Sequence, residues 1–162
     1  MAKHYSVRCR GCIHADAIPE ELKGLRRWVV WRAVPNIDPQ KKARKVPINP
    51  KTGKPASATN PSTWASFEVA QEALRRAPQT YVGLMFALDP EDGYVIVDLY
   101  KCRNPNNNTL NAQAQAILKL LNSYTEASPS GTGIHAIVKA KKPGDRCRHD
   151  KIEMYDHARS SP

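Results

Sequence analysis

The sequence predicts a mixed α/β or α+β domain, with a mixed β-sheet flanked by helices. Short stretches rich in β-branched and aromatic residues alternate along the chain with stretches of helical periodicity. The segments between them are dense in Pro, Asn, Gly and Ser, which favour turns. A chain of 162 residues is long enough for one domain with a buried core. We therefore expect the helices to pack against one sheet.

The predicted strands share an enrichment in Val, Ile and aromatic residues, and they cover residues 27–34, 45–49, 81–88, 93–99, 134–140 and 151–155. The second of these is expected at a sheet edge, because Pro47 has no amide hydrogen to donate. The "NPKTGK" segment that follows it predicts a turn, with Gly53 at positive φ. Residues 104–111 and 124–133 are predicted to be loops.

Three helices are predicted. A short one at residues 19–25 begins with Pro19 in its first turn. The other two cover residues 67–77 and 112–123, and Ser66 and Asn111 are suited to cap them. The residues expected on their apolar faces are Val69, Ala70, Ala73 and Leu74 in one helix, and Ile117, Leu118 and Leu121 in the other.

The chain is strongly basic, with 25 Lys and Arg against 15 Asp and Glu, a net charge of +10. Such a charge indicates a polyanionic partner, above all nucleic acid, although a merely soluble basic surface would give the same count. The longest apolar run, residues 82–88, is far too short to span a membrane. Four cysteines without a secretory signal predict a cytoplasmic location.

One carboxylate lies at the end of an apolar strand in "GYVIVDLYKCRNP". A residue two positions after Asp98 projects from the same face of the strand, and a second acid there would form a clamp for a divalent cation. Tyr100 occupies that position. Its phenol is neutral at pH 7 and is a poor magnesium ligand. Taken alone, Asp98 is more typical of an ordinary surface acid at the end of a strand.

Two further stretches carry polar groups suited to a site. In "SPSGTGIH", the amides and hydroxyls around Ser130, Gly131 and Thr132 are able to face a phosphate, with His135 beginning the next strand. Loops of this composition are also common turns. In "KIEMYD", Glu153 alternates with apolar neighbours, which places it either at a sheet edge or in a site.

Together these segments resemble the primase–polymerase domain of the archaeo-eukaryotic primase superfamily, in the version found in replication proteins of phages and plasmids. The resemblance rests on Asp98 in its apolar strand, then "NSYTEASPSGTGIH", then "IEMYD". The stretches "IPEELKGLRRWVVWR", "KVPINPKTGKPASATNPSTWASFEVA" and "VGLMF" also match. It predicts a primase–polymerase-like domain at residues 18–162, and the sequence of residues 1–17 predicts an irregular arm before it.

The resemblance implies a role for each matching residue. Asp98 and Glu153 would bind a catalytic Mg²⁺ or Mn²⁺ ion, and Ser130 and His135 would contact the phosphates of an incoming NTP or dNTP. His135 would also belong to the catalytic set, and Gly131, Thr132 and Lys139 to the nucleotide pocket. A basic block, defined as Arg44, Lys45, Lys51 and Lys54, would suit the backbone of single-stranded or template–primer DNA, or a triphosphate, unless it is only a solvated loop.

Two departures from the family pattern weaken the expected nucleotidyltransferase chemistry. Tyr100 stands where the family has a second acid, so one ion at most would be held, and weakly. The chain also stops soon after "IEMYD", where the family continues with further core; this predicts a truncated domain with an open sheet edge. We therefore expect retained binding and impaired catalysis.

Two alternatives remain open at this stage. The domain is an active polymerising enzyme, or it is an interaction factor of a mobile element, for instance an inhibitor of a host nucleic-acid machine, which would bind a host or replisome protein. Separately, Cys9, Cys12, Cys147 and His149, with His14 nearby, have the residue types of a zinc site. The same residues would equally be unrelated thiols and imidazoles.

Overall fold

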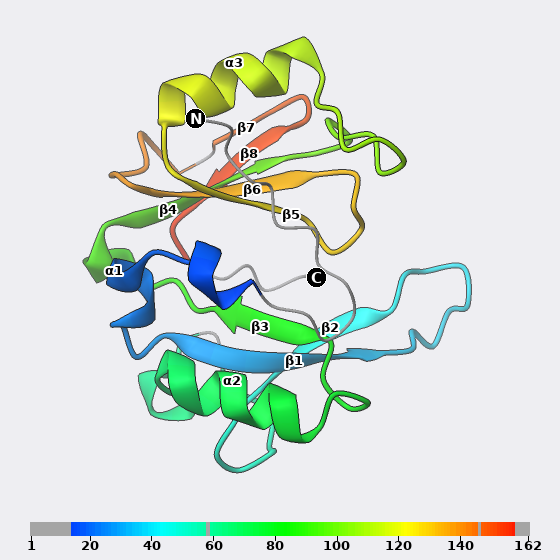
Figure 1. Cartoon of the computed structure of the whole chain (residues 1–162), viewed down its shortest axis with the longest axis vertical. Coiled ribbons are helices and arrows are strands. Elements are labelled where there is room, and N and C mark those ends of the chain that lie inside the picture. Colours follow the sequence, from blue (N-terminus) through cyan, green and yellow to red (C-terminus); the bar gives the residue numbers. More distant parts are fainter. Residues whose placement is uncertain (1–13, 58, 146, 158–162) are drawn as a thin grey trace. The chain divides into compact units, whose positions relative to one another are not determined.

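The structure is a computed structural model, and it describes residues 14–57, 59–145 and 147–157 (Figure 1). The described residues divide into two compact units, which we treat separately: a first unit ending at Ala87 and a second unit beginning at Leu88. The predicted domain of residues 18–162 therefore spans both units. Of the predicted N-terminal arm, residues 1–13 lie outside the described residues, and Ala15–Ala17 form a 3₁₀ turn (η1).

The first unit is built on a three-stranded antiparallel sheet. Its strands are β1 (Trp28–Val34), β2 (Arg44–Ile48) and β3 (Gly83–Phe86), in the order β2-β1-β3. The edge position predicted for the Pro47 strand is confirmed, and Pro47 lies opposite Trp31 of β1. The turn after β2 also follows the prediction, since Gly53 has a φ of 69° and its amide donates to the carbonyl of Asn49.

Two helices belong to this unit, α1 (Glu20–Lys23) and α2 (Phe67–Arg76), with a 3₁₀ turn, η2 (Pro61–Thr63), before α2. Ser66 caps α2 as predicted, accepting the amide hydrogen of Val69 at 3.5 Å. The buried face of α2 consists of Phe67, Ala70 and Leu74, and the Phe67 ring meets Trp28 edge-on at 5.1 Å. The expectation that Val69 points inward was wrong: its side chain is exposed, because Phe67 sets the buried face one residue earlier.

The second unit is built on a five-stranded antiparallel sheet. Its strands are β4 (Tyr94–Leu99), β5 (Tyr124–Ala127), β6 (Ile134–Lys139), β7 (Arg148–His149) and β8 (Ile152–Tyr155), in the order β5-β6-β4-β8-β7. A 3₁₀ turn, η3 (Pro90–Asp92), precedes β4. The helix α3 (Ala112–Leu121) begins at Asn111, whose side chain accepts the amide hydrogen of Ala114 at 2.9 Å. It ends where Asn122 takes a left-handed conformation.

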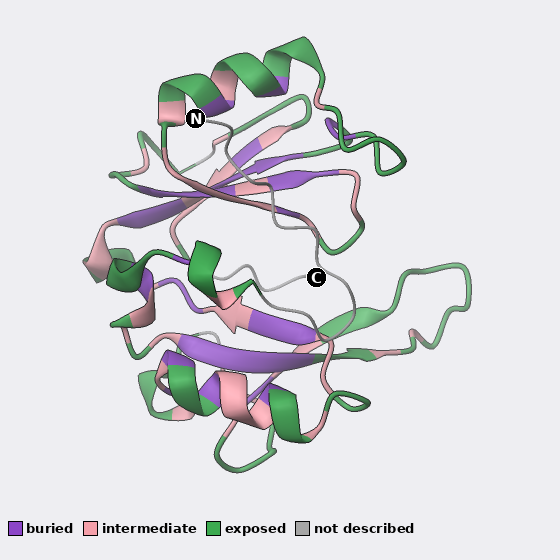
Figure 2. Ribbon diagram, in the orientation of Figure 1, coloured by how far each residue is buried: buried purple, intermediate pink, exposed green. Residues whose placement is uncertain are grey.

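One face of this sheet is apolar and lies under α3 (Figure 1). Strand side chains alternate between faces, so the apolar residues of β4 and β6 fall on one side in register. They form a cluster with Ala114 and Leu118 of α3, while Ile117 and Leu121 pack at its margin. Figure 2 shows the pattern: the buried residues of α3 face the sheet and its exposed residues face outward. The core members from the strands are Val95, Val97, Leu99, Ala127, Ile134, Ala136 and Val138.

The predicted α+β class is confirmed, with two differences in detail. The strands form two antiparallel sheets instead of one, and α2 and α3 each pack on a different sheet. Strand pairing is a long-range property that local patterns do not encode. The prediction of a loop at residues 124–133 was also wrong in its first part. Tyr124–Ala127 form β5, which pairs along β6 as an edge strand.

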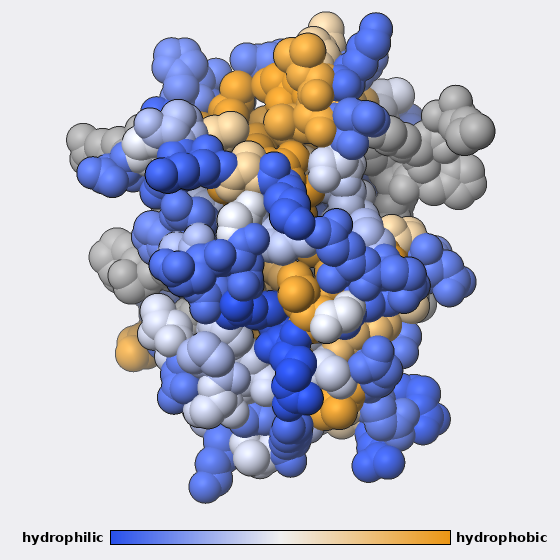
Figure 3. Space-filling model, turned by 90° about the vertical axis from the view of Figure 1, so that its left-hand side faces the viewer, coloured by the Kyte–Doolittle hydropathy of each residue, from blue (hydrophilic) through white to orange (hydrophobic). Residues whose placement is uncertain are grey.

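Within the described part of the chain, no helix has the length and apolarity needed to cross a membrane. The face drawn in Figure 3 consists mostly of hydrophilic residues, and its hydrophobic residues gather mainly at the top centre of the view. This agrees with a chain in which a quarter of the residues are charged.

Candidate functional site

Polar side chains cross the sheet of the second unit in a single row, on the face opposite α3. The strand registers place His135 and Glu153 directly opposite Asp98, one on each side, and Glu126 directly opposite His135. Directly opposed residues project from the same face, with Cβ atoms about 4.5–5.5 Å apart. We call Glu126, His135, Asp98 and Glu153 the acidic row. The three residues predicted from separate motifs, Asp98, His135 and Glu153, are thus brought together by the fold.

The members of the row interact electrostatically. His135 lies between two carboxylates: its Nε2 is 3.7 Å from Asp98 Oδ1, and its Nδ1 is 3.6 Å from Glu126 Oε1. Asp98 is 8% exposed and Glu153 is 1% exposed, so these acids are shielded from bulk solvent. Buried carboxylates require hydrogen bonds or positive charge, and they are therefore suited to a cationic or hydrogen-bonding ligand.

Tyr100 extends the row at the end of β4. It lies two residues after Asp98, and its hydroxyl donates a hydrogen bond of 2.7 Å to Glu153 Oε2. Tyr100 is 38% exposed, but partial desolvation of its hydroxyl, the bond to Glu153 and the nearby charge of Asp98 together raise its pKa above the ordinary value. The phenol therefore keeps its proton at neutral pH. It occupies one oxygen of Glu153 as a donor and offers no negative charge to a cation.

This arrangement predicts an alkaline titration. A raised folded-state pKa contributes stability that is complete below the unfolded value of about 10 and is lost as pH rises above it. The chain has six tyrosines, so the difference in tyrosinate absorbance between the wild type and Tyr100→Phe isolates one group. We expect the Tyr100 phenol to ionise well above the ordinary tyrosine pKa of about 10. Ionisation at the ordinary value would contradict the hydrogen bond to Glu153.

The loop between β5 and β6 lies beside the acidic row. Gly133 precedes β6 by one residue and His135 by two, so the loop is roughly 7 Å from the row along the strand. A chain of hydroxyls runs through it, with Ser128 Oγ 2.9 Å from Ser130 Oγ and Ser130 Oγ 3.0 Å from Thr132 Oγ1. The predicted neighbourhood of Ser130, Thr132, His135 and Asp98 is therefore present.

The amides of Gly131, Thr132 and Gly133, in contrast, are engaged within the loop. The amide of Gly131, whose φ is 76°, donates to Ser128 O at 2.8 Å. Those of Thr132 and Gly133 donate to the hydroxyls of Ser130 and Ser128. The hydroxyls of Ser130 and Thr132 are the groups best suited to meet an anion.

Gly133 is required by a close approach of the loop to β4. A Cβ atom at this position would lie 2.9 Å from the carbonyl oxygen of Leu99 and 3.1 Å from Ser128 Oγ. We expect Gly133→Ala to lower the free energy of unfolding by about 1–3 kcal/mol, because backbone has to shift. Urea denaturation measures the change. Gly144→Ala is the matched control, since nothing lies within 4 Å of its added Cβ; equal effects of the two variants would contradict the close approach.

Two residues of this neighbourhood were missed from the sequence. Glu126 was missed because residues 124–127 were assigned to a loop, and only the register of β5 with β6 places it opposite His135. Arg103 was missed because its partners are distant in sequence. It is 5% exposed, and its Nη1 donates to Gly131 O at 2.6 Å, across 28 positions of the chain. The polar run "KCRNPNNN" gave no sign of that contact.

The remaining predicted residues lie elsewhere in the fold. Lys139 is four residues along β6 from His135, roughly 13 Å at about 3.3 Å per residue. It lies at the far end of the strand from the Ser130 loop, with its Nζ 5.9 Å from the centre of the Tyr94 ring. One phosphate group would not contact both Lys139 and the loop.

The basic block belongs to the first unit. Arg44 and Lys45 begin the edge strand β2, and Lys51 and Lys54 belong to the turn that follows it. All four residues are exposed. The Nζ of Lys45 lies 5.7 Å from the centre of the Trp31 ring, a cation–π distance that orients this side chain on β1.

The donor set fits a two-ion centre poorly. No cluster of three or more His, Cys, Asp or Glu residues with metal-binding geometry is found among the residues the structure describes. Two carboxylates, Asp98 and Glu153, face each other across the strands, but one oxygen of Glu153 already accepts the phenol hydrogen. Hard divalent cations take six or more oxygen ligands, so a single ion would depend mainly on ligand phosphates and water.

The zinc hypothesis is only partly within the described residues, because Cys9 and Cys12 lie outside them. Cys147 donates to the carbonyl of Gly144 with a sulfur–oxygen distance of 3.3 Å, and His149 lies opposite Ile152 in the β7–β8 hairpin. Neither contact indicates a metal.

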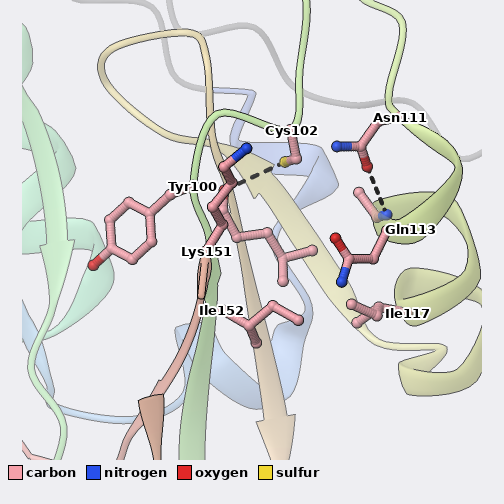
Figure 4. A pocket seen from close by; sticks show the side chains of 9 residues that line it. Tyr100, Cys102, Asn111, Gln113, Ile117, Lys151 and Ile152 are labelled. Atoms are coloured by element: carbon pink, nitrogen blue, oxygen red, sulfur yellow. Dashed lines mark hydrogen bonds between the residues drawn. The ribbon is translucent and has the colours of Figure 1, made fainter. Parts of the chain in front are cut away.

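A small cavity on the α3 side of the second sheet is distinct from the acidic row. It measures about 10 Å³, room for a single water molecule. Figure 4 shows Cys102, Gln113 and Ile117 around it, while the ring of Tyr100 points away from these residues, from the other side of β4. This cavity is too small for a nucleotide.

Comparison with known proteins supports the resemblance carried by these residues. The chain is 34% identical over 148 residues to the DNA primase-polymerase of Nitratiruptor phage NrS-1. The match covers 85% of this chain. The chain is a primase–polymerase domain of the phage type. No family model matches the chain. The domain spans 19% of the length of the phage protein, so the activity of that whole protein is a separate question.

Proposed function

We propose that this primase–polymerase domain binds nucleotide and DNA in a replication protein but polymerises nucleotides weakly or not at all. The proposal rests on one observation above others: the Tyr100 hydroxyl donates to Glu153 Oε2 at 2.7 Å. A phenol thus stands beside the two acids at the position where a third carboxylate would add negative charge.

The chemistry of phosphoryl transfer explains why this substitution matters. The reaction depends on positioning and on neutralising the charge that develops on the transferred phosphate. Enzymes that use divalent cations for this purpose hold them with several carboxylates. Asp98 and Glu153 supply two, and Tyr100 keeps one oxygen of Glu153 engaged. Mg²⁺ or Mn²⁺ would therefore bind weakly, as one ion shared with the phosphates of a ligand.

The side chains suited to nucleotide binding do not depend on the carboxylate that Tyr100 replaces. Ser130 and Thr132 offer hydroxyls beside the row, and His135 offers an imidazole held between Asp98 and Glu126. A neutral phenol in place of a carboxylate also lowers the repulsion felt by an approaching phosphate. We propose that this face takes the triphosphate of an NTP or dNTP.

DNA binding is assigned to the basic block of the first unit. Exposed Lys and Arg side chains attract the phosphate backbone without reading base sequence. Arg44 and Lys45 on the edge strand and Lys51 and Lys54 in the turn fall within one stretch of sequence, residues 44–54. Lys139 would make a peripheral contact with a bound nucleotide or DNA strand.

Calorimetric titration with ATP and with single-stranded DNA tests the proposal. We expect both ligands to bind at low salt. His135→Ala should lower the affinity for ATP. It should change the affinity for DNA by less than about twofold, since phosphate contacts of the basic block dominate DNA binding. The matched control is His157→Ala, a histidine outside the acidic row. Absence of binding by both ligands would overturn the proposal and favour an interaction factor that binds a host or replisome protein.

A further inference from the structure

A buried arginine joins the two loops that flank the end of β4. The backbone amide of Arg103 donates to Thr132 O at 3.0 Å, and its Nη1 donates to Gly131 O at 2.6 Å. Its Nη2 donates to the side-chain oxygen of Asn108 in the Asn-rich loop. One residue therefore fixes the hydroxyl loop between β5 and β6 through both its main chain and its side chain.

The position of the guanidinium follows from the local backbone. β4 ends at Leu99, and Lys101 takes a left-handed conformation with a φ of 48°, which turns the chain. Cys102 is then buried, with its Sγ donating to Leu99 O at 3.3 Å. An isolated bridge between Arg103 and Leu110 closes the Asn-rich loop behind it. The turn thus directs Arg103 toward Gly131 rather than into solvent.

These contacts do not compensate for the free energy of burying the Arg103 guanidinium. Both of its side-chain acceptors are neutral oxygens, so the bonds do not neutralise the buried charge. Its Nε–H is buried and finds no hydrogen-bond acceptor among the residues that the structure describes. Burying an uncompensated charge and an unsatisfied donor is unfavourable, and residues kept at such a cost are expected at functional sites.

An anion bound to the hydroxyl loop would offset the unfavourable free energy of burying the Arg103 charge. A phosphate held by Ser130 and Thr132 would lie over the loop that the guanidinium supports from within, where low polarity strengthens the attraction between opposite charges. The loop is also pre-shaped by the bond to Gly131 O, which lowers the ordering cost of binding.

We infer that Arg103 is a positioning residue for nucleotide phosphate: it holds the Ser128–Gly133 loop in its binding shape and supplies positive charge beneath it. The inference rests on the proposed nucleotide binding and adds a residue to it. It requires no contact between Arg103 and the ligand. Its effect is transmitted through the backbone of Gly131 and Thr132 to the hydroxyls of Ser130 and Thr132.

Titration of ATP against three variants tests the inference. Arg103→Met should weaken ATP binding by about tenfold or more, and Arg103→Lys should recover part of that loss because it restores charge without the fork of donors. Arg75→Met is the matched control. It removes an equal charge from an exposed position on α2 and should change ATP affinity by less than about twofold.

A double-mutant cycle separates positioning from general damage. If Arg103 acts through the loop, Arg103→Met should cost much less in a Ser130→Ala, Thr132→Val background than in the wild type. If Arg103→Met fails to fold, the same double-mutant cycle is measured with Arg103→Lys and with Asn108→Ala, which removes only one hydrogen-bond acceptor of Arg103.

The outcomes are distinguishable. Tight ATP binding by the wild type, with Arg103 variants equal to Arg75→Met or with fully additive losses, would overturn the inference and leave the proposed function standing. If the wild type itself does not bind ATP at low salt, the proposed nucleotide binding fails and the inference fails with it.

Discussion

Replacement of Tyr100 by Asp should raise the affinity of this domain for Mn²⁺ above that of the wild type. The variant places a third carboxylate beside Asp98 and Glu153 and removes the phenol hydrogen that occupies Glu153 Oε2. Without metal, three crowded negative charges should lower the melting temperature relative to the wild type. With Mn²⁺ present, the variant should regain that stability, because a ligand that binds only the folded state stabilises it.

The same variant should raise manganese-dependent nucleotide incorporation by about tenfold or more, equivalent to about 1.4 kcal/mol of barrier. Tyr100→Asn is the control, since it also removes the phenol but adds no charge. Calorimetry with Mn²⁺ and an incorporation assay measure the two effects. If Tyr100→Asp shows no greater Mn²⁺ affinity than Tyr100→Asn, residue 100 does not limit metal binding, and the surface has been altered elsewhere as well.

Removal of three lysines from the basic block should weaken DNA binding in a salt-dependent way. Each phosphate contact contributes about 0.7 to 0.9 to the slope of log affinity against log salt, so Lys45, Lys51 and Lys54 changed to Ala should flatten it by roughly 2 to 3 units. Sequence preference should not change, because phosphate contacts carry no base information. Titrations of single-stranded and duplex DNA at several salt concentrations measure the slope.

The control for this prediction removes the same number of positive charges elsewhere. Arg75, Arg76 and Lys119 are exposed helix residues outside the basic block, and their triple replacement by Ala should change the slope by less than about one unit. Equal flattening by the two triple variants would mean that DNA responds to net charge alone. The basic block would then have no special role.

Much of the local structure could be predicted from the sequence because its signals are local. As predicted, the side chain of Asn111 caps α3, Gly53 takes the positive φ of its turn, and Pro47 lies on an edge strand. The failures were long-range or marginal. β5 was missed because its four residues lie between turn-forming Ser, Asn and Pro residues, and it exists through pairing with β6. The division into two sheets is likewise decided by pairing.

The candidate site shows the same contrast between local sequence signals and long-range contacts. Asp98, His135 and Glu153 were identified by their motifs, and the registers of β4 with β6 and β8 place them in one row. Glu126 entered the row only through the strand that was missed. The hydrogen bond from Tyr100 to Glu153 joins residues 53 positions apart, and no local pattern predicts it. Tyr100 was noticed as an absent acid, whereas the structure shows it as a donor that engages another acid.

Primer extension by the unmodified chain tests the central proposal most directly. The assay combines template–primer DNA, labelled nucleotide and Mg²⁺ or Mn²⁺, and it compares the wild type with Asp98→Ala. We predict that incorporation by the wild type exceeds that of Asp98→Ala slightly or not at all, although the wild type binds ATP and DNA in parallel titrations. Robust incorporation by the wild type that Asp98→Ala abolishes would show that Tyr100 leaves the catalytic site functional, and it would contradict the proposed loss of catalysis.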